Sequence, residues 1–232
     1  MGNGSIGFDL NDMSSEDKYK LLNEISDLDN ITEKELKILN ILSYDKGDEI
    51  RSQVAEILEN SETVESENIL IRLLKDEDGL VRAVSCDSLR YSNSLEVLNH
   101  LIDIAQKDKT DLARGYAASS ISSILVNMDM VGKEHLDLFK DLLKKEKVTW
   151  VKLHIYKSLY LLGESSYLSK LIDMLNHKHF RKRGAVVNIL LDLVSDENKE
   201  IIKSSLLELL KKEKTINVRS SIENALQDME EN

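Results

Sequence analysis

The sequence predicts an all-α protein, a right-handed α-solenoid built from about six stacked helix pairs. A basic residue followed seven positions later by an aliphatic residue recurs six times, and successive basic residues are 31, 32, 38, 31 and 36 positions apart. A period in this range is typical of helix pairs that bury their apolar faces only against neighbouring pairs. The chain also lacks proline, so no helix is interrupted by a missing N–H group. The six recurrences are Arg51/Leu58, Arg82/Leu89, Arg114/Ile121, Lys152/Leu159, Arg183/Leu190 and Arg219/Leu226.

In chain order, the sequence reads as a lead-in, a capping helix and six helix pairs. Residues 1–13 contain three glycines and no periodic apolar pattern, so we expect a flexible lead-in before one solenoid domain at 14–229. Ser14 precedes acidic residues that suit a helix N-terminus, and this first helix should cap the open end of the stack. Gly163 is expected to end a helix, and residues 230–232 to fray. The first predicted pair is 36–42 with a helix that follows the Gly47-Asp48 turn and runs to about residue 59. The other pairs are 65–75 with 80–91, 94–107 with 111–128, 133–145 with 149–162, 165–176 with 179–194, and 196–212 with 215–229.

The second helix of each pair should bury the positions −1, +3, +4 and +7 from its basic residue. These offsets lie on one side of an α-helix, and most of them hold small or aliphatic residues. Cys86 occupies a +4 position, so we expect a buried thiol that acts as a small hydrophobe. Because it is the single cysteine, no intrachain disulfide is available. Glu223 departs from the pattern at the last pair, where the stack ends.

Charge is distributed unevenly along the chain, whose net charge is −11. Residues 1–79 hold 20 Asp/Glu and 8 Lys/Arg, whereas residues 133–183 hold 12 Lys/Arg and 6 Asp/Glu. The electric field of this uneven charge distribution orients charged partners and does not set the fold. No apolar stretch approaches the roughly 20 residues that a membrane-spanning helix needs. Residues 1–12 also lack the pattern of a secretory signal, so we expect a cytoplasmic protein.

The segment from Asp78 to Leu89, with Val81-Arg82 near its start, resembles the second helix of a HEAT-like repeat of the PBS-lyase type. Asp48-Glu49-Ile50-Arg51 and Asn217-Val218-Arg219 look like the same motif, and the likeness covers roughly residues 33–229. The resemblance implies that the Asp begins the second helix and that the basic residue pairs with acids of adjacent repeats. It also implies that the second helices line a concave face.

Catalytic relatives of this repeat type fit the sequence poorly. HEAT-like deoxyhypusine hydroxylases use His-Glu dipeptides as metal ligands, but here Glu134-His135 is reversed. HEAT-fold alkylpurine DNA glycosylases are basic and use several tryptophans, whereas Trp150 is the only one here. Phycobilin lyases share this repeat type, but nothing in the sequence beyond the repeat supports a pigment-binding site. No P-loop, Rossmann, nucleophile-elbow or zincin motif occurs. We therefore expect no catalytic residue, no metal and no cofactor.

The exposed positions of the second helices should fall near +2, +5 and +8 from the basic residue. With Tyr and Trp as the usual anchors of interfaces, the central aromatic residues form a candidate binding centre, although they could also fill gaps between helices. The candidate protein-binding residues on the concave face are Gln53, Glu56, Asp87, Tyr116, Trp150, His154, Lys157, Tyr160, Asn188 and Asn224.

The run His177–Arg183 is the densest basic segment. Its candidate anion contacts are Lys178, Arg181, Lys182 and Arg183; the alternative is a solvated turn with one structural Arg. The two histidines in this turn lack flanking ligands at metal spacing.

Three functional hypotheses follow. The first is a non-enzymatic protein-binding module, monomeric when free, such as a bacterial immunity protein that inhibits a toxin. The second is nucleic-acid binding through residues 133–183. The third is an accessory or lyase-like protein that acts on a bound protein.

Overall fold

A computed structural model describes residues 10, 12–59, 61 and 63–231 of the chain. Within these ranges all regular elements are α-helices, so the predicted all-α class is confirmed. The lead-in predicted for residues 1–13 lies outside the described residues except at positions 10, 12 and 13, and Asn232 lies outside them too. The helices are α1 (Ser15–Ser26), α2 (Glu33–Leu42), α3 (Asp48–Leu58), α4 (Val64–Leu73), α5 (Gly79–Ser88), α6 (Leu95–Lys107), α7 (Asp111–Asn127), α8 (Lys133–Lys145), α9 (Thr149–Leu161), α10 (Ser166–Met174), α11 (Phe180–Asp192), α12 (Lys199–Lys212) and α13 (Ile216–Glu231).

Side-chain caps and one glycine define several helix ends. The Ser14 Oγ accepts a hydrogen bond from the Asp17 N–H at 3.2 Å, as expected for an N-cap. At the end of α9, Gly163 has φ +100°, a left-handed conformation in which a side chain is strained. This conformation lets the Glu164 N–H reach the Leu159 carbonyl at 2.9 Å, which closes the helix. The predicted role of Gly163 is therefore confirmed.

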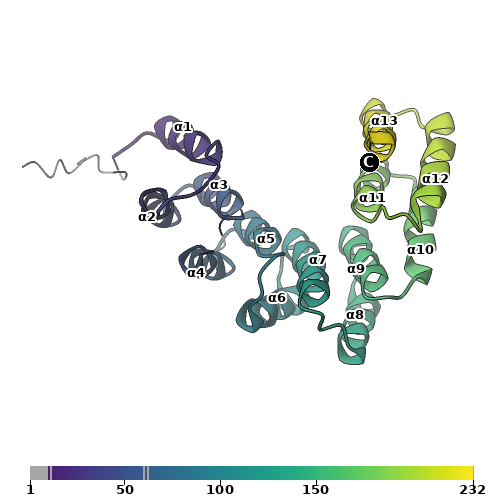
Figure 1. Cartoon of the computed structure of the whole chain (residues 1–232), viewed down its shortest axis with the longest axis horizontal. Helices are drawn as coiled ribbons and strands as arrows, with labels where there is room; N and C mark the ends of the chain where they lie inside the picture. Colours follow the sequence, from purple (N-terminus) through teal and green to yellow (C-terminus); the bar gives the residue numbers. More distant parts are fainter. Residues whose placement is uncertain (1–9, 11, 60, 62, 232) are drawn as a thin grey trace, which may run out of the picture. The chain divides into compact units, whose positions relative to one another are not determined.

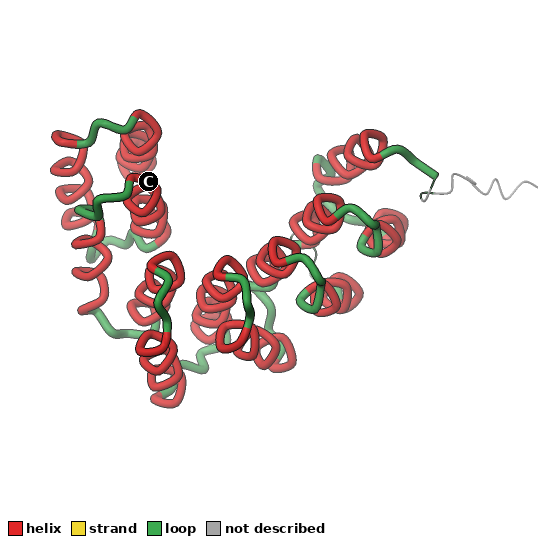
Figure 2. The backbone as a smooth tube through the Cα atoms, turned by 180° about the vertical axis from the view of Figure 1, so that it is seen from behind, coloured by secondary structure: helices red, strands yellow, loops and turns green. Residues whose placement is uncertain are grey.

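The chain divides into two compact units, residues 1–120 and 121–232. In the first unit, α1, α3 and α5 pack side by side in one layer, and α2 and α4 cover them in a second layer (Figure 1). In the second unit, α9, α11 and α13 form the equivalent layer, with α10 and α12 beside it (Figures 1 and 2). This arrangement of successive helix pairs is the predicted α-solenoid. A single domain spanning 14–229 stays a prediction.

The core follows the predicted offsets of the second helices. Val54, Ala55 and Leu58 of α3 are buried, and Cys86 of α5 is fully buried as expected. Glu223 is exposed in the last helix, where no further pair covers it. The interior of each unit is therefore made mostly of aliphatic side chains, and the scarce aromatic residues lie largely at its margins.

Candidate functional site

The repeated basic residues of the first unit form a chain of buried ion pairs. Arg51 donates two hydrogen bonds to the Asp76 carboxylate, both of 2.7 Å, and a third of 2.8 Å to the Asp45 carbonyl. Arg82 repeats this arrangement with the Asp108 carboxylate at 2.7 and 2.8 Å and the Asp76 carbonyl at 2.7 Å. All four charged side chains are 8–9% exposed. Each Arg thus joins its own pair to the next one.

The acidic partner of each Arg lies in the turn between the two helices of the next pair, six residues before the basic residue of that pair: Asp76 precedes Arg82, and Asp108 precedes Arg114. Asp76 also accepts the Asp78 N–H at 2.9 Å, and Asp108 accepts the Thr110 N–H at 2.8 Å. Burial alone would raise the pKa of both carboxyl groups, but the hydrogen bonds from arginine and backbone lower it. The carboxylates therefore remain charged, and each one orders its own turn while it binds the preceding repeat.

The helix α1 belongs to the same series, which the sequence analysis did not recognise. Lys18 contacts the Asp45 carboxylate at 2.6 Å, with both side chains at most 10% exposed. Lys18 lies 33 positions before Arg51 and is followed seven positions later by buried Ile25. Asp17 occupies position −1 relative to Lys18, where most of the other motifs have an apolar residue, so the motif is not apparent from the sequence. The predicted capping helix is therefore the second helix of a half repeat.

In the second unit, Arg183 holds the equivalent ion pair with Glu213, at 2.5 and 2.8 Å. The Glu213 side chain is 1% exposed, and the hydrogen bond from Arg183 lowers its pKa to about 2. Arg183 was a candidate anion contact, but this pairing favours its structural alternative. Lys178 and Arg181 are exposed and Lys182 is half-buried, so these three residues stay available to an anion.

A groove of about 400 Å³ lies beside this ion pair, between the turns of the fifth and sixth helix pairs. Lys178, Lys212 and Lys214 line it, and Lys212 is held by the Asn176 side chain at 2.8 Å. The Arg183 guanidinium neutralises the one carboxylate in the lining, so the groove has a net positive charge.

The +5 positions of the second helices form what we call the outward row: Glu56, Asp87, Lys157, Asn188 and Asn224. At about 100° per residue, +5 lies opposite the buried side of each helix. Glu56, Asn188 and Asn224 are exposed, whereas Asp87 and Lys157 are half-buried. Lys157 contacts Asp192 at 2.8 Å, and Asp87 contacts Arg90 at 3.2 Å.

The prediction that His154 is exposed on the concave face is wrong, because its exposed fraction is only 6%. The Trp150 ring, one helical turn earlier, packs edge-on against it at 4.3 Å between ring centroids. Burial, with a smaller effect from Lys157, lowers the pKa of His154 to about 3, so the imidazole is neutral. His154 therefore belongs to the interior and not to a contact surface.

The remaining candidates lie half-buried between helices. Tyr116, Trp150 and Tyr160 are partly exposed, and the Tyr160 hydroxyl accepts a hydrogen bond of 2.9 Å from Asn198. Gln53 donates to Asn23 of α1 at 2.7 Å. These contacts match the alternative in which the side chains fill gaps, at least for the buried part of each ring.

Ser119 and Ser122 of α7 occupy +5 and +8 positions that were expected to be exposed, and both are buried. The small side chains of α7 allow close packing, and the Ser122 hydroxyl contacts the Ser158 hydroxyl of α9 at 3.1 Å. The outward row therefore has no member on α7.

No cluster of three His, Cys, Asp or Glu side chains suited to a metal ion occurs in the described ranges. None of the described helices is both long and apolar enough to cross a membrane.

Residues 35–122 match the family model of HEAT repeats, which confirms the resemblance for α2 to α7. The helix pairs within residues 35–122 are thus HEAT repeats, and the fold of the chain is an all-α solenoid. Comparison with curated proteins finds no significant match.

Two solved structures share the fold over most of the chain. One is the complex of CpcE and CpcF of phycocyanin lyase from a Nostoc species, with 14% identity, 91% of this chain and 87% of that chain covered, and a TM-score of 0.58. The other is YibA of Escherichia coli, with 17% identity, 92% of this chain and 75% of that chain covered, and a TM-score of 0.54. At these identities the likeness concerns the fold alone.

Proposed function

We propose that this protein is a non-enzymatic protein-binding module that contacts its partner through the outward row. The observation that carries the proposal is the series of buried ion pairs, which fixes neighbouring second helices in one rotational register. As a result, Glu56 and Asp87 point to the same side of the first unit, and Asn188 and Asn224 to the same side of the second. Exposed side chains in register on packed helices provide the extended surface with which repeat proteins bind.

Charge favours a basic partner for the first unit. Residues 1–120 hold 25 Asp/Glu and 13 Lys/Arg, a difference of −12, whereas residues 121–232 hold 17 and 18. The acidic members of the outward row, Glu56 and Asp87, lie in this unit. Complementary charge accelerates association and selects among partners. A toxin domain with a basic surface, which the protein would neutralise by covering it, is one partner of this kind.

The sequestration of reactive groups supports a role without catalysis. Cys86 is fully buried and its pKa is raised by burial, so the thiolate needed of a nucleophile is disfavoured. His154 is buried in its neutral form, and the Arg51, Arg82 and Arg183 guanidinium groups are bound to carboxylates.

The test compares two matched double variants in affinity purification from native extract. Glu56→Arg with Asn188→Arg alters the outward row, whereas Glu208→Arg with Asn99→Arg makes the same chemical changes on exposed positions of α12 and α6. We expect a partner that the wild type and the α6/α12 variant retain and the row variant loses. A partner held equally by both variants would show that the binding surface lies elsewhere.

A further inference from the structure

Arg72 of α4 is a half-buried guanidinium whose direct hydrogen-bond and ring partners are all neutral groups. It donates to the Ser43 hydroxyl at 2.7 Å and to the Asn40 side-chain oxygen at 3.2 Å, and it lies 3.7 Å from the centroid of the Tyr44 ring. No carboxylate oxygen of the described residues lies within 4 Å of it, in contrast to Arg51 and Arg82. A partly desolvated charge without a counter-ion is unfavourable, and an anionic group from outside would stabilise it.

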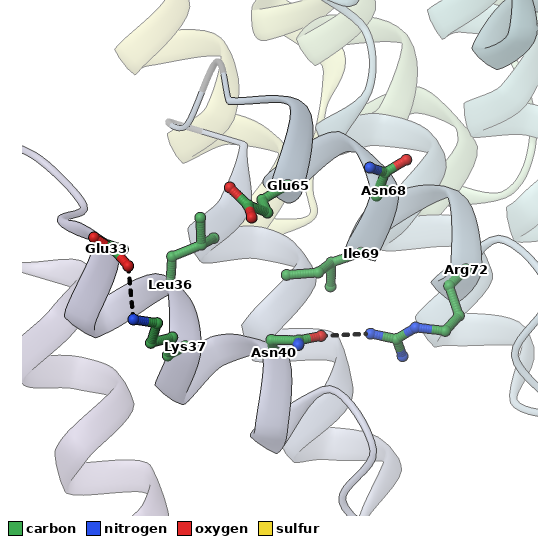
Figure 3. A pocket seen from close by; sticks show the side chains of 8 residues that line it. All are labelled: Glu33, Leu36, Lys37, Asn40, Glu65, Asn68, Ile69 and Arg72. Carbon is green, nitrogen blue, oxygen red and sulfur yellow. Dashed lines mark hydrogen bonds and ion pairs between the residues drawn. The ribbon is translucent and has the colours of Figure 1, made fainter.

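The guanidinium lies at one end of a groove of about 250 Å³ between α2 and α4 (Figure 3). Leu36 and Ile69, at 8% and 5% exposed, face each other in its middle. At the other end, Glu33 is paired with Lys37 at 2.6 Å, while Glu65 is exposed and forms no ion pair with a described residue. The groove therefore offers a cation, an apolar floor and an anion in sequence.

We propose that this outer groove docks an extended protein segment in which an acidic, an apolar and a basic side chain follow one another. Arg72 binds the carboxylate through the N–H groups that Asn40 and Ser43 leave free, and these two residues already orient its guanidinium. The apolar side chain rests on Leu36 and Ile69, and the basic one pairs with Glu65. The groove is smaller than the 300 Å³ or more typical of small-molecule pockets, which suits a few side chains of a larger partner.

The surface around Arg72 extends the contact. Tyr44, two residues after the end of α2, is 68% exposed and lies against the guanidinium, and Ile41 in the last turn of α2 is 47% exposed. An aromatic ring beneath an arginine is a common anchor of protein interfaces. This site lies on the layer of α2 and α4, so it does not depend on the outward row.

The test measures fluorescence anisotropy of a fluorescein-labelled peptide, Gly-Asp-Ser-Leu-Ser-Lys-Gly, with the full chain; alternate residues of an extended segment face the same side, so its Asp, Leu and Lys can enter the groove together. Arg72→Gln should weaken binding by about tenfold or more, because a charge-assisted hydrogen bond is lost. Arg90→Gln is the matched control, since Arg90 also lies near a tyrosine ring, 4.9 Å from the Tyr91 centroid, but is paired with Glu59. This control should bind like the wild type.

A charge swap separates recognition from a general loss of fold. The Glu65→Lys variant should lose affinity for this peptide and recover it for the peptide with Glu in place of Lys, because Glu65 is exposed and its exchange leaves the core intact. An affinity that Arg72→Gln does not change, or complete displacement of the peptide by millimolar inorganic phosphate, would overturn the proposal. The second result would identify a simple anion site.

Discussion

Asp108→Asn should destabilise the protein far more than an isosteric change at an exposed ion pair. The Asp108 carboxylate accepts two hydrogen bonds from Arg82 and one from the Thr110 N–H, and the two charged side chains are 8% and 9% exposed. Asparagine cannot accept both guanidinium hydrogen bonds, and it leaves a buried positive charge without a counter-ion. Breaking a buried pair in this way costs about 3–5 kcal/mol.

The control is Asp141→Asn, whose partner Lys144 lies 2.9 Å away with side chains 60% and 76% exposed. An exposed pair of this kind contributes about 1 kcal/mol or less. Urea unfolding followed by circular dichroism gives both values. With a slope of about 2 kcal/mol per molar urea, the Asp108→Asn midpoint should fall by about 2 M and the control midpoint by less than about 0.5 M. Equal midpoints for the two variants would refute the structural role of the ion-pair series.

Three further predictions concern stability. The pKa of His154 is lowered to about 3 in the folded protein, so its neutral form contributes stability above the unfolded pKa, and this contribution is lost as pH falls. Between pH 7 and pH 5, the free energy of unfolding of the wild type should therefore fall by about 2 kcal/mol more than that of His154→Gln, as measured by urea titrations. Gly163→Ala should lower the melting temperature, at a cost of about 1 kcal/mol, because φ is +100° at this position. Gly184→Ala inside α11 should raise the melting temperature, since alanine favours the helix and the added methyl group makes only an ordinary contact. A shift of the same sign for both variants would contradict this prediction. Lys18→Met should accelerate amide hydrogen exchange throughout α1, while Lys20→Met, at an exposed pair, should leave it unchanged; similar rates in both variants would mean that the Lys18 pair does not hold α1 in place.

Helix existence and order were predictable because each pair repeats the same apolar spacing and the same turn residues. The ends of α8 were predicted to the residue, and the role of Gly163 followed from the glycine itself. α1 was harder to place as a half repeat, since Asp17 replaces the apolar residue before Lys18. Only the contact between Lys18 and Asp45 reveals its kinship with the other second helices.

Exposure on the second helices could be inferred only in part. Helix geometry places +5 outward, and Glu56, Asn188 and Asn224 are exposed accordingly. His154 is buried because the Trp150 ring covers it, and Ser122 because α9 approaches closely. Such burial depends on neighbours far apart in sequence, and periodicity within one helix carries no information about them.

The sequence alone determined the repeating helix pairs, because local spacing of apolar residues decides which side of a helix is buried. It also indicated, through the family resemblance, that the repeated basic residues pair with acids. The tertiary structure decided which acids these are, since a carboxylate meets its arginine only after two pairs have stacked. It likewise left Arg72 without an ion pair, because no carboxylate oxygen of the described residues comes within 4 Å of its guanidinium.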